Sequence, residues 1–308
     1  MGAKPLVGVG LPVYNGEEFL AAAIDSVLAQ TFHDFEIIIS DNGSTDRTEQ
    51  ICREHASREP RVTYHRAAEN RGIVWNYNQV FQLSPSHQYF MWFSHDDVLA
   101  PTYLERCVEI LQADSTVALS FSNWGEIDST GGLLNSHKSR VIMDAPNPVE
   151  RFRQAIRLEH LCEPWCGVTR SAIVKKTGGY GSYADYDRVL FAEIGLYGRF
   201  VEIPEALFFR REHKGRSIYL HPSRFERTSW IAPQRGGEIV FPHFRELREF
   251  WSAVKRSNLP RAERNACNWA LLGWAKSYWR RLADDIKIAI HEILRRVVRP
   301  QPAPSKQL

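Results

Sequence analysis

The sequence predicts an α/β fold in which a mainly parallel sheet is flanked by helices, with a helical appendage at the C-terminal end. The first observation behind this prediction is that apolar runs of strand length alternate with helical segments through the first third of the chain. That alternation is typical of a parallel sheet covered on both faces. The second observation is that the alternation stops near His221 and longer helical segments follow. We therefore expect one domain over residues 1–220 and a C-terminal helical region over residues 221–308.

Four strands and three helices are expected in the first third of the chain. The strand-like runs are Leu6 to Pro12, Phe35 to Ser40, Val62 to His65 and Tyr89 to Phe93. The helices that follow the first three strands are expected over Glu18 to Gln30, from the turn after Asp46 to about Glu59, and from Gly72 to near Leu83. The fourth strand is apolar or aromatic at every position, as expected of a strand buried on both faces.

Three further helices are expected in the C-terminal region. They span Phe241 to Val254, Arg261 to Arg281 and Asp284 to Val298, with prolines as breaks. The tail after Pro300 is expected to be disordered.

The composition is that of an ordinary globular protein. Of the 308 residues, 44% are hydrophobic and 24% are charged. The net charge of +3 is too small to indicate a nucleic-acid partner. Five scattered cysteines match no common zinc pattern, which favours reduced thiols in a cytosolic protein. The N-terminal residues lack the apolar core of a signal peptide, and no stretch reaches the roughly eighteen apolar residues of a membrane span. We therefore expect a cytoplasmic protein.

The turn Ser94-His95-Asp96-Asp97 is the leading candidate for a functional site. Two adjacent carboxylates at the end of a buried strand are costly to desolvate unless a positive charge neutralises them. A divalent cation would do so, since Mg²⁺ favours one or two carboxylates together with substrate phosphates. Ligands of open α/β sheets also collect at the carboxyl ends of the strands. The alternative is a helix start near Pro101, where acidic residues favour the helix dipole.

A dinucleotide-binding site is disfavoured. Gly8-Val9-Gly10 has the glycine spacing of that fingerprint, but these glycines lie inside the first strand. Pro12 and Val13 then follow where the fingerprint needs a glycine that opens a helix.

Six short motifs, spread over residues 5–220, resemble those of family 2 glycosyltransferases in type and order. They are Leu11-Pro12-Val13-Tyr14-Asn15-Gly16, Ser40 to Asp46, Asn70-Arg71-Gly72 with Asn78, Ser94-His95-Asp96-Asp97, Gly178-Gly179-Tyr180 with Ala184-Asp185-Tyr186-Asp187, and Phe209 to Ser217. The resemblance implies the GT-A fold and an inverting transferase that uses a nucleotide-diphosphate sugar, often a UDP-sugar. It also implies a divalent metal, Mg²⁺ or Mn²⁺. The implied acceptor is a hydroxyl of a glycan or a lipid-linked molecule, as in cell-envelope polysaccharide synthesis.

The resemblance assigns part of the nucleotide-sugar site to the first three turns. Pro12, Val13 and Tyr14 would line the nucleoside pocket. Asp41 would hydrogen-bond the base. Arg71 would contact the base or the phosphates.

The resemblance assigns the reacting end of the site to later motifs. Ser94 and His95 would belong to the nucleotide-sugar site, and Asp96 would hold the metal that bridges the diphosphate. His213 would reach the metal or the phosphate from the far side. Asp185 would be the catalytic base.

Two departures from the family pattern leave a second function open. Ser94 stands where the family usually has the first aspartate of its metal motif, and a hydroxyl is a weaker metal ligand than a carboxylate. Ala184 stands where the family often has a glutamate before the base. The alternative function is therefore a non-catalytic nucleotide-sugar-binding pseudoenzyme.

Several of these residues also have a purely structural explanation. Asp41 is suited to local backbone bonds in a turn, and Asp185 to the start of a helix. Arg71 and His213 are suited to a solvated surface. Trp165 would either stack on an acceptor sugar or pack in the core.

The end of the chain suggests contact with a membrane. From Lys276 onward there are eight basic and three acidic residues beside an isoleucine-rich helix. Such a helix suits the surface of an anionic membrane, here the inner face of the cytoplasmic membrane. A helix packed on the protein with solvated arginines is the alternative.

Overall fold

The structure, a computed structural model, describes residues 4–84, 86–139, 143–157, 166–231 and 239–298. Three features discussed from the sequence lie outside these residues: Cys162, Trp165 and the tail after Pro300. Cys52, Cys107, Cys166 and Cys267 are buried free thiols.

Within the described residues, nine strands form one mixed sheet. The strands are β1 Val7–Val13, β2 Phe35–Asp41, β3 Val62–Arg66, β4 Tyr89–Trp92, β5 Val98–Leu99, β6 Val117–Ile127, β7 Leu133–His137, β8 Val168–Arg170 and β9 Arg199–Arg211. Their order is β3-β2-β1-β4-β8-β6-β9-β5, and β7 pairs with β6. The first four strands in this order are parallel, as expected, and β6 is parallel to β9. Strand β8 is antiparallel to both β4 and β6, between which it lies.

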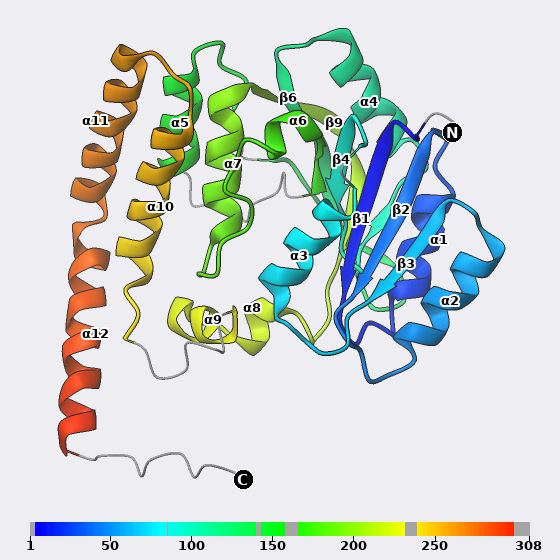
Figure 1. The fold of residues 1–308 in the computed structure, drawn as a ribbon, viewed down its shortest axis with the longest axis horizontal. Helices are drawn as coiled ribbons and strands as arrows, with labels where there is room; N and C mark the ends of the chain where they lie inside the picture. Colours follow the sequence, from blue (N-terminus) through cyan, green and yellow to red (C-terminus); the bar gives the residue numbers. More distant parts are fainter. Residues whose placement is uncertain (1–3, 85, 140–142, 158–165, 232–238, 299–308) are drawn as a thin grey trace.

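Helices cover both faces of this sheet (Figure 1). One buried cluster contains side chains of α1 Leu20–Leu28, α2 Thr48–Arg58 and α4 Tyr103–Ala113. The other contains side chains of α3 Ile73–Gln82, α5 Pro148–Arg157, α6 Ser171–Val174, α7 Tyr186–Tyr197, α9 Arg224–Ile231, α10 Pro242–Arg256 and α11 Arg261–Ser277. Phe90 and Trp92 of β4 face the second cluster, whereas Tyr89 and Met91 face the first. The fourth strand is therefore buried on both faces, as predicted.

The C-terminal helices pack on α7 and α5. Phe250 of α10 and Trp274 of α11 lie in the same buried cluster as Phe152 of α5 and Leu190 of α7. The division of the chain at residue 220 stays a prediction, since the helices beyond it share this core.

The last helix, α12 Trp279–Val298, begins earlier than expected. The sequence analysis placed the break between Arg281 and Asp284, but α11 and α12 meet at Tyr278. No proline or glycine marks the break. Among the described residues, no helix is long and apolar enough to cross a bilayer.

Candidate functional site

The candidate site begins at the turn after β4. Val98 and Leu99 pair with the end of β9, so this turn lies beside the segment that follows β9. There, Nε2 of His213 lies 3.0 Å from Oδ2 of Asp96, and the Ser94 hydroxyl donates to Oδ1 of Asp96. The structure thus brings together three residues that the sequence analysis assigned to the metal and nucleotide-sugar site.

Asp97 and Arg211 fix this turn from its buried side. The backbone N–H of Arg211 donates to the Asp97 carboxyl group over 2.9 Å, and the Arg211 guanidinium donates to the Asp96 carbonyl over 3.0 Å. Burial and the nearby Asp96 charge raise the pKa of Asp97 well above its ordinary value. Burial also acts to raise the pKa of Asp96, but the bond to His213, the nearby His95 and the Ser94 hydroxyl outweigh it and lower that pKa. The lowered pKa favours the ionised form of Asp96.

A pocket of about 220 Å³ opens beside this turn. Its polar and aromatic lining comprises Ser94, Asp96, Asp97, Asp187, Arg210, Arg216, Ser217, Tyr77, Tyr180 and Tyr186. Both arginines are held by glutamates, Arg210 by Glu126 at 2.6 Å and Arg216 by Glu212. The pocket thus combines acidic, basic and aromatic side chains from the turn after β4, from α3, from α7 and the segment before it, and from the end of β9 and the segment after it.

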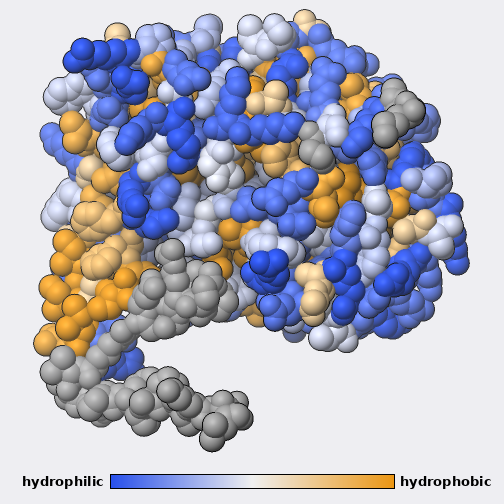
Figure 2. All heavy atoms as spheres, viewed as in Figure 1, coloured by the Kyte–Doolittle hydropathy of each residue, from blue (hydrophilic) through white to orange (hydrophobic). Residues whose placement is uncertain are grey.

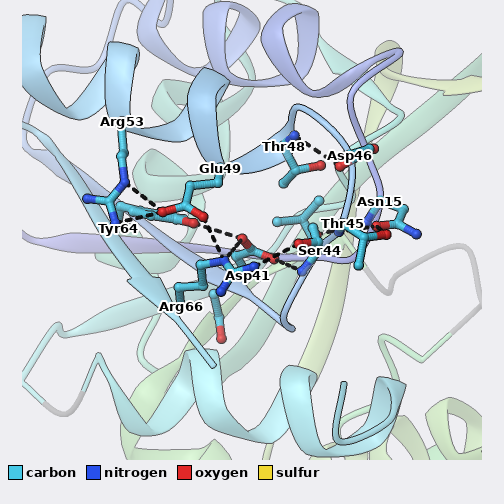
Figure 3. A network of polar contacts seen from close by, with 12 residues as sticks. Asn15, Asp41, Ser44, Thr45, Asp46, Thr48, Glu49, Arg53, Tyr64 and Arg66 are labelled. Carbon is cyan, nitrogen blue, oxygen red and sulfur yellow. Dashed lines mark hydrogen bonds and ion pairs between the residues drawn. The ribbon is translucent and has the colours of Figure 1, made fainter. Parts of the chain in front are cut away.

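Asp41 sits at the centre of a polar network after β2 (Figure 3). Its carboxylate is fully buried and accepts hydrogen bonds from the Ser44 N–H at 2.9 Å and the Tyr64 hydroxyl at 2.7 Å. Nε of Arg66 lies 3.4 Å from the same carboxylate. These contacts match the structural explanation for Asp41, and its contact with a nucleotide base stays a prediction.

Hydrogen bonds between backbone N–H groups and polar side chains join the turns after β1, β2 and β3. The Asn15 N–H donates to the Ser44 hydroxyl over 2.9 Å, and the Asn42 side-chain oxygen accepts the Arg71 N–H over 3.0 Å. The exposed Arg71 guanidinium lies 4.4 Å from the centre of the Trp75 ring. Since these turns end neighbouring parallel strands, the proposed nucleotide residues share one edge of the sheet.

The first turn contributes both buried and exposed residues. Pro12 and Val13 are buried, whereas Tyr14 is 42% exposed. A Cβ atom on Gly16 would lie 2.6 Å from the His95 ring, so His95 packs against this turn. The turn after β1 and the turn after β4 are therefore in contact.

Asn78 of α3 holds the segment that precedes α7. Its side-chain amide donates to the Tyr180 carbonyl over 2.8 Å and accepts the Tyr180 N–H over 3.0 Å. Gly179, one residue earlier, has φ of +65°, which favours glycine. Two separate motifs of the sequence thus meet at the pocket wall.

Gly179→Ala is expected to lower the free energy of unfolding by about 1 to 3 kcal/mol. An added Cβ would lie 2.8 Å from Oδ1 of Asn78, in a backbone conformation that alanine rarely adopts. Urea unfolding measures the loss. Gly273→Ala in α11 is the matched control, because nothing lies within 4 Å of its added Cβ and alanine favours a helix. Equal midpoints for Gly179→Ala and the wild-type chain would contradict this account.

Asp185 lies directly before α7, beside the pocket. It is absent from the pocket lining, while the next two residues, Tyr186 and Asp187, are part of it. Nε of Arg224 lies 2.5 Å from Oδ2 of Asp185. The structural explanation for Asp185, a place at the start of a helix, agrees with α7, which begins at Tyr186. The role of Asp185 as base therefore stays a prediction, with Asp187 as the nearest alternative.

Comparison with known families decides what kind of site this is. The model of glycosyl transferase family 2 matches residues 9–177. The chain belongs to glycosyl transferase family 2. This finding confirms the family that the motifs predict.

The relatives of this family 2 chain are mostly longer proteins. The chondroitin synthase of Escherichia coli is 33% identical over 132 residues, which cover 43% of this chain and 19% of that protein. An uncharacterized glycosyltransferase of Rickettsia felis is 34% identical over 143 residues, 45% of this chain and 23% of that protein. The chain thus spans about a fifth of the length of these curated relatives.

Solved structures confirm the GT-A fold. TarS of S. aureus in complex with UDP-GlcNAc superposes with a TM-score of 0.64 at 15% identity, covering 94% of this chain and 82% of that one. The mannosyltransferase PcManGT of Pyrobaculum calidifontis, in complex with GDP-Man and Mn²⁺, gives 0.51 at 16% identity and covers 97% and 82%. At these identities the likeness concerns the fold alone.

The metal that the family implies can be tested against the residues present. Among the described residues, no group of three or more His, Cys, Asp or Glu side chains is arranged to hold a metal ion. Asp96 and His213 are in contact, however, and Asp96 lines the pocket. One carboxylate and one imidazole fit a cation that takes its remaining ligands from phosphates and water.

Proposed function

We propose that this family 2 chain transfers a sugar from a nucleotide-diphosphate sugar, specifically a UDP-sugar, to a hydroxyl of a glycan or lipid-linked acceptor, with inversion at the anomeric carbon. One observation carries the proposal. A single pocket is lined by the ionised Asp96, which contacts His213, and by Asp187 at the start of α7. The UDP-GlcNAc bound to TarS supports a UDP-sugar, and the chondroitin synthase relative supports a glycan acceptor.

Asp96 and His213 would hold the divalent cation, Mg²⁺ or Mn²⁺, together with the phosphates of the nucleotide. Bound there, the cation would supply positive charge to the departing diphosphate. Asp97 and Arg211 keep the Asp96 backbone in place for this task. The Mn²⁺ in the PcManGT complex supports a metal in this fold.

The nucleoside would lie along the turns that end β1, β2 and β3. Pro12 and Val13 would form the buried floor, and the exposed Tyr14 and Arg71 would contact the base or the phosphates. Asp41 would bond the base by exchanging one of its present contacts, with Tyr64 or Arg66, for the ligand.

Asp185 is the proposed general base. The acceptor hydroxyl is a poor nucleophile at neutral pH, so a carboxylate must accept its proton as attack proceeds. The hydroxyl oxygen forms a bond to the anomeric carbon, and the bond from that carbon to the diphosphate breaks on the opposite face. The diphosphate leaves with the bonding electrons, and the proton goes to Asp185.

Turnover tests this proposal. Release of a nucleoside diphosphate with transfer of the sugar to an acceptor would support it. Binding of a nucleotide-sugar without turnover would instead support the pseudoenzyme, the alternative that Ser94 and Ala184 leave open.

We also propose that α12 rests on the inner face of an anionic membrane. Its exposed apolar side chains, each at least 43% exposed, are Ile286, Ile288, Ile290, Ile293 and Leu294. Trp269 and Leu272 of α11 and Trp279 of α12 are exposed as well, and Figure 2 shows hydrophobic residues gathered on the side of the molecule where these two helices lie. The exposed Lys276, Arg280 and Arg295 supply positive charge beside it. The alternative, in which this apolar face packs on the protein, does not explain that exposure.

The full chain is expected to sediment with anionic vesicles and to stay in solution with neutral ones. Each basic residue near an anionic surface contributes on the order of 1 kcal/mol. Ile290→Glu with Leu294→Glu should release the protein from the vesicles, while Leu133→Glu, at a residue of β7 that is 61% exposed, should have no effect. Substitutions are preferable to truncation near Asp284, because the buried Asp285 accepts the His243 N–H at the start of α10. No sedimentation of the full chain with anionic vesicles, or undiminished sedimentation of the Ile290→Glu, Leu294→Glu variant, would rule out a membrane contact through α12.

A further inference from the structure

Four charged side chains connect the start of α7 with the helices beyond residue 220. Asp185 pairs with Arg224 of α9 at 2.5 Å, and Arg224 donates to Oε2 of Glu246 in α10 over 3.0 Å. Oε1 of Glu246 lies 2.7 Å from Nη1 of Arg188. Arg188, like Tyr186 and Asp187, belongs to α7. Two acids and two bases thus alternate in one charge-neutral cluster.

The inner half of this cluster is buried. Glu246 is 1% exposed and Arg188 is 5% exposed. Each of these buried charges would strongly destabilise the fold if its partner were removed. The side chains of Arg224 and Asp185, at 18% and 20%, lie nearer the surface. Because Glu246 binds Arg224 on one oxygen and Arg188 on the other, the position of Arg224 is set by α10 and α7 together.

The backbone at Asp185 also depends on its surroundings. Its φ of +58° and ψ of +31° lie in the left-handed region, which non-glycine residues rarely occupy. Such a conformation persists where neighbouring contacts hold it, and it is frequent at functional sites. The ion pair with Arg224 is a contact that holds the Asp185 side chain in this turn.

A second ion pair attaches α10 to the same part of the site. Arg256 binds the buried Glu193 of α7 through two bonds of 2.8 and 2.9 Å, and Glu193 also accepts the Gly178 N–H over 3.0 Å. Tyr180 and Tyr186, which line the pocket, belong to the two segments that α10 holds in this way.

We infer that Arg224 is a positioning residue for Asp185, and that α9 and α10 thereby form part of the catalytic apparatus of the proposed transferase. The inference rests on the proposed function, since it assumes that Asp185 accepts the proton of the acceptor. The guanidinium orients the carboxylate and itself touches no reacting atom. Misplacement of a reacting group by about 1 Å costs a transfer step roughly 100-fold.

Steady-state transfer by the full chain tests the inference. Arg224→Ala should lower kcat by about 10- to 100-fold, with KM for the nucleotide-sugar unchanged. Guanidinium at non-denaturing, millimolar concentration should restore part of the lost kcat. Arg224→Lys should retain more activity than Arg224→Ala, because it keeps the charge without the planar fork. Arg227→Ala is the matched control on α9, since Arg227 bonds only the carbonyls of His221 and Pro222 in the described part of the chain.

The outcomes separate this inference from the proposed function. Absence of transfer by the wild-type chain would overturn the proposed function, and this inference with it. Transfer that Asp185→Asn abolishes but Arg224→Ala leaves intact would overturn the inference alone. A loss for Arg224→Ala that guanidinium cannot restore, with a matching fall in nucleotide-sugar affinity, would also overturn it, because it would indicate only a structural role.

Discussion

Asp185→Asn is expected to lower the rate of sugar transfer by about 100- to 10,000-fold, the range over which general bases contribute. The amide cannot accept the proton of the acceptor hydroxyl, so the chemical step fails. Nucleotide-sugar affinity should stay unchanged, since the base acts only during transfer. Initial rates at saturating nucleotide-sugar measure the transfer rate, and calorimetric titration measures the affinity for the nucleotide-sugar.

Two comparisons make the Asp185 experiment decisive. Asp34→Asn, which changes an exposed aspartate ahead of β2, should leave the transfer rate and the nucleotide-sugar affinity unchanged. Asp187→Asn changes the aspartate that lines the pocket two residues further on. Full transfer by Asp185→Asn together with loss of transfer by Asp187→Asn would move the base to Asp187.

Asp96→Asn is expected to weaken metal-dependent binding of the nucleotide-sugar by at least about tenfold and transfer by about 100-fold. Although burial acts to raise it, the pKa of Asp96 is lowered by the bond to His213, by the nearby His95 and by the Ser94 hydroxyl, which favours the ionised carboxylate that a cation binds. Removing the metal from the wild-type chain with a chelator should reproduce both effects. Readdition of Mg²⁺ or Mn²⁺ should reverse them only in the wild-type chain.

Ser94→Asp provides a matched test of the same site. It restores the carboxylate that the family usually has at this position, so metal affinity should increase, since added ligand charge tightens the binding of hard cations. If a chelator leaves nucleotide-sugar binding and transfer intact in the wild-type chain, the site is independent of metal and the role assigned to Asp96 is wrong.

The sequence alone was sufficient to predict the parallel strands β1 to β4 of the sheet. Strands β1 to β4 begin and end within a residue of their expected positions, because each is an apolar run bounded by polar turn residues. The antiparallel insertion of β8 between β4 and β6 could not be anticipated. Its few residues carry no alternation, and its place depends on contacts with strands far away in the chain.

In the candidate site too, the sequence motifs identify individual residues, whereas contacts between distant residues are visible only in the folded chain. The resemblance placed both Asp96 and His213 at the metal, and the structure brings the two side chains into contact across 117 positions of the sequence. Asp187, Arg216 and Ser217 lie in motifs that the sequence analysis quoted, but only the folded chain shows that they line one pocket. The ion pair between Asp185 and Arg224 had no sequence signal, because the residues of α9 match no motif.

The proposed function requires that this chain bind and turn over a nucleotide-diphosphate sugar at the pocket beside Asp96. Its most direct test is a panel of UDP- and GDP-sugars offered to the wild-type chain with Mg²⁺ or Mn²⁺, with thermal stability and nucleoside diphosphate release recorded for each. A ligand that binds the native state raises its stability by mass action. We expect that a UDP-sugar raises the melting temperature and releases UDP when an acceptor glycan is present, and that Asp96→Asn loses both responses. No response to any member of the panel, or an undiminished response in Asp96→Asn, would contradict it.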